Sequence, residues 1–144
     1  MWFNPIIEWL LRSPFHSFVS KNMMLVTYTG RKSGKKYSTP VNYINMIQAG
    51  DHFMATTSLR DRTWWRNLRG GVPFVARLRG KDYSATSEVI EDDQGVIENL
   101  VDYFQQWPEG AKYFEVGIDS KGQPDLEDLS TAAKTRVFIK TFLS

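Results

Sequence analysis

The stretch MMLVTYTGRKSGKKYSTPVNYINMI (residues 23–47) places a basic, glycine-containing bend between two apolar runs. The runs MMLVTY and VNYINMI are rich in β-branched and aromatic residues, which is typical of strands. Gly30 and Gly34 allow the chain to turn between them. A strand, a bend and a returning strand predict that the fold is built on an antiparallel sheet.

The rest of the chain supplies more strands and two helices. The predicted strands are residues 23–29, 41–47, 52–57, 72–79, 83–90 and 136–143. Six strands joined mostly by short turns predict an antiparallel sheet that closes into a small barrel. One helix starts at Asp92 or Asp93 and ends before Pro108, with an apolar stripe of Val96, Ile97, Leu100, Val101 and Phe104, and a second covers 124–134. The fold class is therefore α+β, in one domain spanning residues 1–144.

Composition narrows the function classes. The 144 residues include no Cys and two His, which excludes thiolate catalysis and leaves too few ligands for the common metal sites. Residues 21–81 carry twelve Lys and Arg against two Asp, a net charge of +10, whereas residues 82–144 carry a net charge of −8. A region this basic indicates an anionic partner.

The N-terminal segment, residues 1–20, is predicted to be helical from Asn4-Pro5. It resembles neither a secretory signal nor a membrane span, so a cytoplasmic protein is expected. Two interpretations of this aromatic segment remain open. It packs onto the domain, or it makes a peripheral membrane or dimer contact.

The bend concentrates Arg31, Lys32, Lys35 and Lys36 around Ser33. It does not match a nucleotide-binding P-loop, because its glycines are one residue too close and no helix follows. Backbone N–H groups that curl around an anion, together with these cations, predict a site for phosphate or carboxylate. A solvated, charged hairpin is the alternative.

A second cluster, TTSLRDRTWWRNLRGG (residues 56–71), combines hydroxyl groups, arginines and two tryptophans. Aromatic walls beside hydroxyls and cations suit a flat, partly anionic ligand. The alternative is that Trp64 and Leu68, four residues apart on a helical turn, belong to the core.

Together the two clusters resemble the deazaflavin-dependent nitroreductase family of the flavin/deazaflavin oxidoreductases. The similarity is carried by LLRSPFHSF, TYTGRKSGKKYSTPVNY and TTSLRDRTWWRNLRGGVPFVARLRGKDY, from about residue 4 to residue 90, and more weakly by WPEGAKYF and the last strand. The resemblance implies a split β-barrel of the FMN-binding type, coenzyme F420 as the cofactor, and a homodimer. Branches of the family bind flavin, haem or fatty acid instead, so the family does not fix the cofactor.

The resemblance also implies roles for individual residues. Arg31, Lys32 and Ser33 would hold the cofactor phosphate, and Lys35 and Lys36 would meet the carboxylates of its tail. Pro40, Thr56, Thr57 and Ser58 would line the ring, with Trp64, Trp65 and Asn67 as the neighbouring wall. The sequence departs from the family at Tyr37, where many relatives carry Arg, and in the loop 59–63, which is shorter than in the best-studied branch.

The expected activity is hydride transfer from reduced F420 to a small organic acceptor such as a quinone, a nitro compound or an activated alkene. Ser58 and Thr57 are the candidate catalytic residues, as hydrogen-bond donors to the ring or to the charge that develops on the acceptor. Tyr113 is a weaker candidate to face the acceptor. Alternatives are an FMN-dependent reductase and a non-catalytic fatty-acid carrier. Nucleic-acid binding is disfavoured, because the cations cluster at two bends and no recognised motif accompanies them.

Overall fold

A computed structural model describes residues 23–144 of the chain. The predictions for residues 1–20, a helix from Asn4-Pro5 and a membrane or dimer contact, lie outside the described residues. None of the helices within 23–144 has the length and apolar character needed to cross a membrane.

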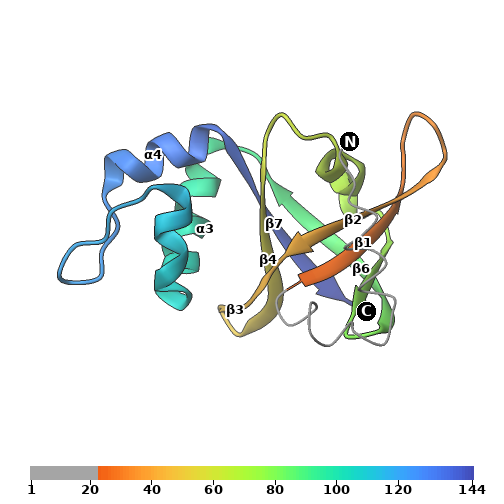
Figure 1. Ribbon diagram of the computed structural model, residues 1–144, viewed down its shortest axis with the longest axis horizontal. Coiled ribbons are helices and arrows are strands. Elements are labelled where there is room, and N and C mark those ends of the chain that lie inside the picture. The colour runs from red at the N-terminus through yellow and green to blue at the C-terminus, as the bar shows by residue number, and fades with distance from the viewer. Residues whose placement is uncertain (1–22) are drawn as a thin grey trace.

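Seven strands form one antiparallel sheet (Figure 1). They are β1 (Met23–Thr29), β2 (Lys36–Asn42), β3 (Ile44–Gln48), β4 (Asp51–Leu59), β5 (Phe74–Leu78), β6 (Lys81–Ile90) and β7 (Arg136–Leu143). Their order across the sheet is β2-β1-β5-β6-β7-β4-β3. This confirms the predicted antiparallel sheet, and β1 and β7 have the predicted bounds. The predicted single strand 41–47 was wrong, because the chain changes partners at Tyr43.

The change of partner at Tyr43 is what curls the sheet. β2 and β3 are separated by Tyr43 alone, yet they occupy opposite ends of the hydrogen-bonding order. β2 pairs along β1 with Thr39 opposite Val26, while β3 pairs along β4 with Met46 opposite Phe53. A flat seven-stranded sheet cannot bring its two edges within one residue of each other, so the sheet bends into an almost closed barrel.

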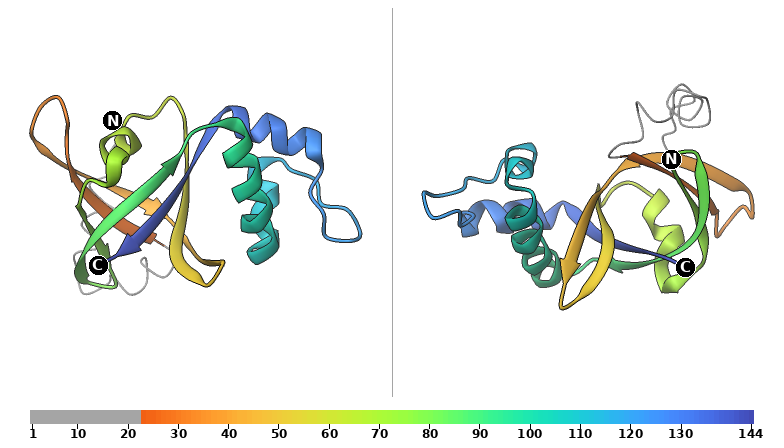
Figure 2. Two further views of the ribbon diagram at one scale, coloured as in Figure 1. Left: turned by 180° about the vertical axis from the view of Figure 1, so that it is seen from behind. Right: turned by 90° about the horizontal axis from the view of Figure 1, so that it is seen from below.

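The interior of the barrel is filled by the short helix η2 (Trp64–Gly71), which stands within the curl of strands in the right-hand view of Figure 2. Trp64, Trp65 and Leu68 of η2 pack with inward-facing strand residues such as Val26 and Ile139 in one hydrophobic cluster. The helix thus takes the place that side chains alone fill in a narrower barrel.

Helices α3 (Asp93–Gln106), η3 (Pro108–Phe114) and α4 (Leu126–Lys134) cover part of the other face of the sheet, at one end of the molecule (Figure 1). Leu100 and Phe104 of α3 and Leu129 of α4 pack with Phe53 and Phe138 in a second cluster. Both faces of β7 are consequently buried. This explains why Phe138 is fully buried although its side chain points to the opposite face of the strand from Val137, which is also buried.

Capping residues set the starts of the two long helices. The carboxylate of Asp92 accepts a 2.7 Å hydrogen bond from the N–H of Gly95, which makes Asp92 rather than Asp93 the N-cap of α3. Asp125 likewise accepts from the N–H of Asp128 at 2.9 Å. α4 therefore begins at Leu126, two residues after the predicted start.

Candidate functional site

A cavity of about 1050 Å³ opens where β2 runs into β3. One wall comes from that corner and from the end of β4 with the start of η2, and the opposite wall comes from α3 and η3. The lining residues from the barrel side are Thr39, Pro40, Val41, Asn42, Tyr43, Ile44, Thr57, Ser58, Leu59, Asp61, Arg62, Thr63 and Trp64. The volume is that of a site for a cofactor-sized ligand.

Four residues expected around a ring lie on this wall: Pro40, Thr57, Ser58 and Trp64. The Ser58 hydroxyl is engaged on both sides, since it accepts from the indole N–H of Trp64 at 3.1 Å and donates to the carbonyl of Leu59 at 3.2 Å. The Thr57 hydroxyl makes no hydrogen bond to any residue of the described part of the chain. Thr57 is therefore the better placed of the two to donate to a ligand.

Thr56 and Trp65 do not line the cavity, which corrects the role that the resemblance implied for them. The Thr56 side chain is buried, and its hydroxyl donates to the carbonyl of Asn42 at 3.1 Å. This bond holds β4 against the corner between β2 and β3. The Trp65 indole is buried in the barrel, donates to the carbonyl of Leu59 at 3.2 Å and lies beneath the guanidinium groups of Arg66 and Arg69. Both side chains therefore support the cavity walls without lining the cavity.

The basic bend and the tryptophan segment meet directly. The backbone N–H of Arg31 donates to Oδ1 of Asn67 at 2.9 Å, and the Arg31 guanidinium donates to the carbonyl of Arg69 at 2.5 Å. Asn67 also donates through Nδ2 to the carbonyls of Thr63 and Trp64, at 3.2 Å each. Asn67 thus links the two segments through hydrogen bonds, and it does not line the cavity.

Within the bend, three further backbone N–H groups donate to groups of the bend itself. Gly30 donates to the carbonyl of Lys35, Gly34 to that of Gly30, and Lys35 to the hydroxyl of Ser33. Ser33 also shares a 3.0 Å hydrogen bond with the Tyr37 hydroxyl. These three N–H groups are therefore not available to an anion. The N–H groups of Lys32 and Ser33 have no hydrogen-bond partner within residues 23–144, so an anion site at the bend stays a prediction that rests on them. A side chain at Gly30 would place its Cβ 2.8 Å from the Tyr37 ring, which explains the glycine.

The bend's charges remain available on the surface. Lys32, Lys35 and Lys36 are exposed and form no ion pair with any residue of 23–144. None of them lines the cavity. The structure thus connects the cations to the cavity in two ways: through β2, which runs from Lys36 to the lining residue Pro40, and through the contact of Arg31 with Asn67 of η2.

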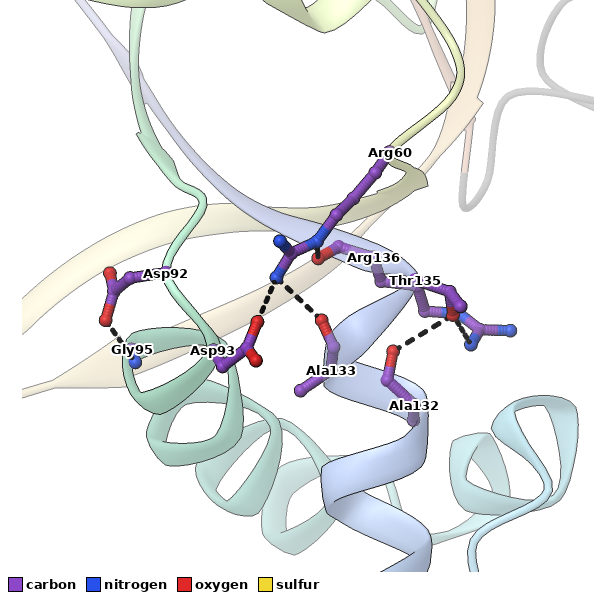
Figure 3. A network of polar contacts seen from close by, with 8 residues as sticks. All are labelled: Arg60, Asp92, Asp93, Gly95, Ala132, Ala133, Thr135 and Arg136. Carbon is purple, nitrogen blue, oxygen red and sulfur yellow. Dashed lines mark hydrogen bonds and ion pairs between the residues drawn. The ribbon is translucent and has the colours of Figure 1, made fainter.

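Most arginines of the second cluster (residues 56–71) make contacts within the protein. Arg69 forms a two-pronged contact with Glu91, at 2.9 and 2.6 Å, and this hydrogen bonding raises the pKa of Arg69. Arg60 binds Asp93 and two backbone carbonyls (Figure 3). Among the arginines of this cluster, Arg62 lines the cavity, next to Asp61.

Sequence reasoning missed most of the aromatic wall opposite the barrel. Tyr103, Trp107, Tyr113 and Phe114 line the cavity from α3 and η3. Trp107 and Tyr113 stack with ring centroids 5.8 Å apart and planes 20° apart, and burial raises the pKa of Tyr103 to about 12. Tyr113, the weaker sequence candidate, is on this wall and two-thirds exposed. The aromatic residues between Trp107 and Phe114 were the sequence signal that could have identified the other residues of this wall.

The residues present fit a flat polycyclic ring. Aromatic side chains form one wall, and Pro40 and Trp64 belong to the other. Thr57 also lines the cavity, and its hydroxyl, which has no hydrogen-bond partner within residues 23–144, could donate to a polar edge of such a ligand. Within residues 23–144, no group of three or more His, Asp or Glu side chains is placed to hold a metal ion.

No protein-family model and no curated protein sequence matches the chain. Three solved structures are similar in fold. An F420-H2 dependent reductase is 18% identical over 83% of this chain and 94% of its own, with a TM-score of 0.43. A domain-swapped dimer is 18% identical over 95% and 99%, with a TM-score of 0.46. A protein of unknown function from Agrobacterium tumefaciens is 15% identical over 93% of this chain and 58% of its own, with a TM-score of 0.50. At these identities, the similarity concerns the fold alone.

Proposed function

We propose that this chain is an oxidoreductase that binds reduced coenzyme F420 and delivers hydride to a small organic acceptor. The observation that carries the proposal is the cavity of about 1050 Å³, walled by Thr57, Ser58 and Trp64 on one side and by aromatic residues on the other. The basic bend reaches the same helix that supplies Trp64, through the contact of Arg31 with Asn67. These are the two sequence segments that resemble the deazaflavin-dependent reductases.

In this proposal the two walls of the cavity have different roles, one toward the cofactor and one toward the acceptor. The bound cofactor supplies the hydride, and the chain supplies binding, orientation and the exclusion of water. Trp64 and Pro40 bound the space for the ring, while Thr57 donates a hydrogen bond to it. The donation by the Trp64 indole fixes the Ser58 hydroxyl in place, so Ser58 acts through its dipole.

The aromatic wall is proposed to face the acceptor. Tyr103, with a pKa raised to about 12, keeps its proton throughout the physiological range and can act only as a neutral hydrogen-bonding group. Tyr113, which is two-thirds exposed, stands where an acceptor would enter. Quinones, nitro compounds and activated alkenes are the acceptor classes that we propose.

Phosphate and tail carboxylates of the cofactor are assigned to the exposed cations of the bend. Lys32, Lys35 and Lys36 have no ionic partner in the described part of the chain, so an anion does not compete with a carboxylate of that part for them. Arg31 and Ser33 are assigned a weaker share, because their polar groups already bind Arg69 and Tyr37. A homodimer and a cytoplasmic location remain parts of the proposal.

The test is a titration of the purified chain with oxidised F420 and, separately, with FMN, followed by the fluorescence of each ligand. We expect saturable binding of F420 and weaker binding of FMN. Mixing the chain with reduced F420 and a soluble benzoquinone should then oxidise the cofactor faster than the uncatalysed reaction. Saturable binding of FMN alone would establish the flavin-dependent reductase instead. Binding of neither ligand, with fatty acid found in the purified protein, would establish a carrier.

A further inference from the structure

Arg60 stands behind the cavity wall. Leu59, Asp61 and Arg62 on either side of it line the cavity, but Arg60 does not. Its side chain extends the other way, toward the helical layer, as Figure 3 shows. The segment 59–63 therefore has one face on the cavity and one residue anchored outside it.

The anchor is a set of four hydrogen bonds. The guanidinium donates through Nε to the carbonyl of Arg136 at 2.9 Å, and through Nη2 to the carbonyl of Ala133 and to Oδ1 of Asp93, both at 2.8 Å. The backbone N–H of Arg60 donates to the carbonyl of Thr135 at 2.9 Å. One residue thus connects the end of β4 to α3, to α4 and to the start of β7.

The charges at this junction support the same arrangement. Ala133 lies in the last turn of α4, where the helix dipole favours a cation. Asp93 is the first residue of α3, where the dipole favours an anion. Arg60 lies between these two helix ends, where its guanidinium interacts favourably with the carbonyl end of α4 and with the Asp93 carboxylate.

We propose that Arg60 is a positioning residue for the cavity. It holds the segment 59–63 against the helical layer, so that the barrel wall and the aromatic wall of the cavity keep a fixed separation. Lysine cannot replace it, because an ammonium on a flexible stem cannot reproduce the planar fork that reaches three acceptors at once. The binding part of the test rests on the proposed F420 function, whereas the exchange part does not.

The experiment compares Arg60→Lys with Arg77→Lys. Arg77 pairs with Asp82 at 3.0 Å, and its side chain is 25% exposed against 33% for Arg60, but it lies away from the cavity on β5. Asp93→Asn and Asp82→Asn form a second matched pair. Because these substitutions are nearly isosteric, they test the same two ion pairs even if an arginine variant fails to fold. Amide hydrogen exchange of residues 59–63 and the Kd for F420 are measured in all four variants and in the wild type.

We expect exchange of the 59–63 amides to rise by about tenfold in Arg60→Lys, with the Kd for F420 weakened by a similar factor. Asp93→Asn should show smaller changes of the same sign, and neither Arg77→Lys nor Asp82→Asn should change either quantity. A Tm lowered equally in Arg60→Lys and Arg77→Lys, with exchange at 59–63 and the Kd unchanged, would overturn the proposal. If the wild type does not bind F420, the proposed function fails, and the exchange measurement alone decides the role of Arg60.

Discussion

The backbone N–H of Arg31 donates a 2.9 Å hydrogen bond to the side-chain oxygen of Asn67, 36 residues further along the chain. This bond attaches the basic bend between β1 and β2 to the helix that fills the barrel. Because Trp64 of that helix lines the cavity, the backbone of the bend keeps a defined position relative to the cavity.

Replacing Asn67 by Ala should detach the bend. The variant loses the acceptor for Arg31 and the two donations to Thr63 and Trp64, which together should lower the free energy of unfolding by about 1–3 kcal/mol. Asn67→Asp keeps the acceptor and should retain the exchange protection of the Arg31 amide. Urea unfolding and amide exchange measure the two effects, with exposed Asn45→Ala as the control. Equal stabilities for Asn67→Ala and Asn45→Ala would contradict the role of Asn67.

Replacing Lys32 by Ala should weaken F420 binding. Loss of one charge-assisted contact to phosphate corresponds to roughly 1.5–3 kcal/mol, or about ten- to hundredfold in Kd. The difference between variant and wild type should shrink as salt is added, because this lysine is exposed. Fluorescence titration at two ionic strengths measures it, with Lys121→Ala, in the turn before α4, as the control. An unchanged Kd in Lys32→Ala would remove Lys32 from the site.

The two adjacent tryptophans should respond differently to replacement by Phe. Trp64→Phe changes the cavity wall and frees the Ser58 hydroxyl, so the Kd for F420 should rise several-fold. Trp65→Phe leaves the cavity lining intact but removes packing beneath Arg66 and Arg69, so the loss should appear as about 1–3 kcal/mol of stability. Titration and urea unfolding of both variants separate the effects. The reverse pattern would show that F420 does not bind in this cavity.

Stability should fall at alkaline pH, because burial raises the pKa of Tyr103 from 10.0 to about 12. Between these values the unfolded chain loses the phenol proton while the folded chain keeps it, so the free energy of unfolding decreases as pH rises. The contribution is fully present below pH 10. Tyr103→Phe should flatten this part of the stability profile, measured by urea unfolding at a series of pH values. Tyr28, whose pKa burial and the nearby Tyr37 also raise to about 12, should leave a residual slope that Tyr28→Phe removes.

Much of the fold follows from local patterns. The apolar alternation of β1 and β7 and the apolar stripe of α3 could be predicted, because each depends on residues a few positions apart. The break at Tyr43 could not, since VNYINMI is continuous as a strand and only the competing partners β1 and β4 divide it. The same limit applies to Phe138, whose burial depends in part on α3 and on Phe53 of β4, which are distant in the sequence.

The candidate site divides in the same way. Trp64, Thr57 and Pro40 could be identified because their residue types stand out in short segments, and the structure places them on the cavity. Trp65 and Thr56 look the same in the sequence, but in the structure both are buried and donate to backbone carbonyls of the protein. The aromatic wall from α3 and η3 could not be located, because nothing local shows which sheet edge these helices approach.

By itself the sequence determined which segments become strands and helices, and where cations, hydroxyls and aromatic rings are concentrated. Only the tertiary structure decided which of those groups face a shared cavity and which pair with other residues of the protein, as Arg60 and Arg69 do with Asp93 and Glu91. The physical reason is that backbone conformation follows from near neighbours, whereas the free energy of a polar or charged side chain depends on partners that folding brings from distant positions.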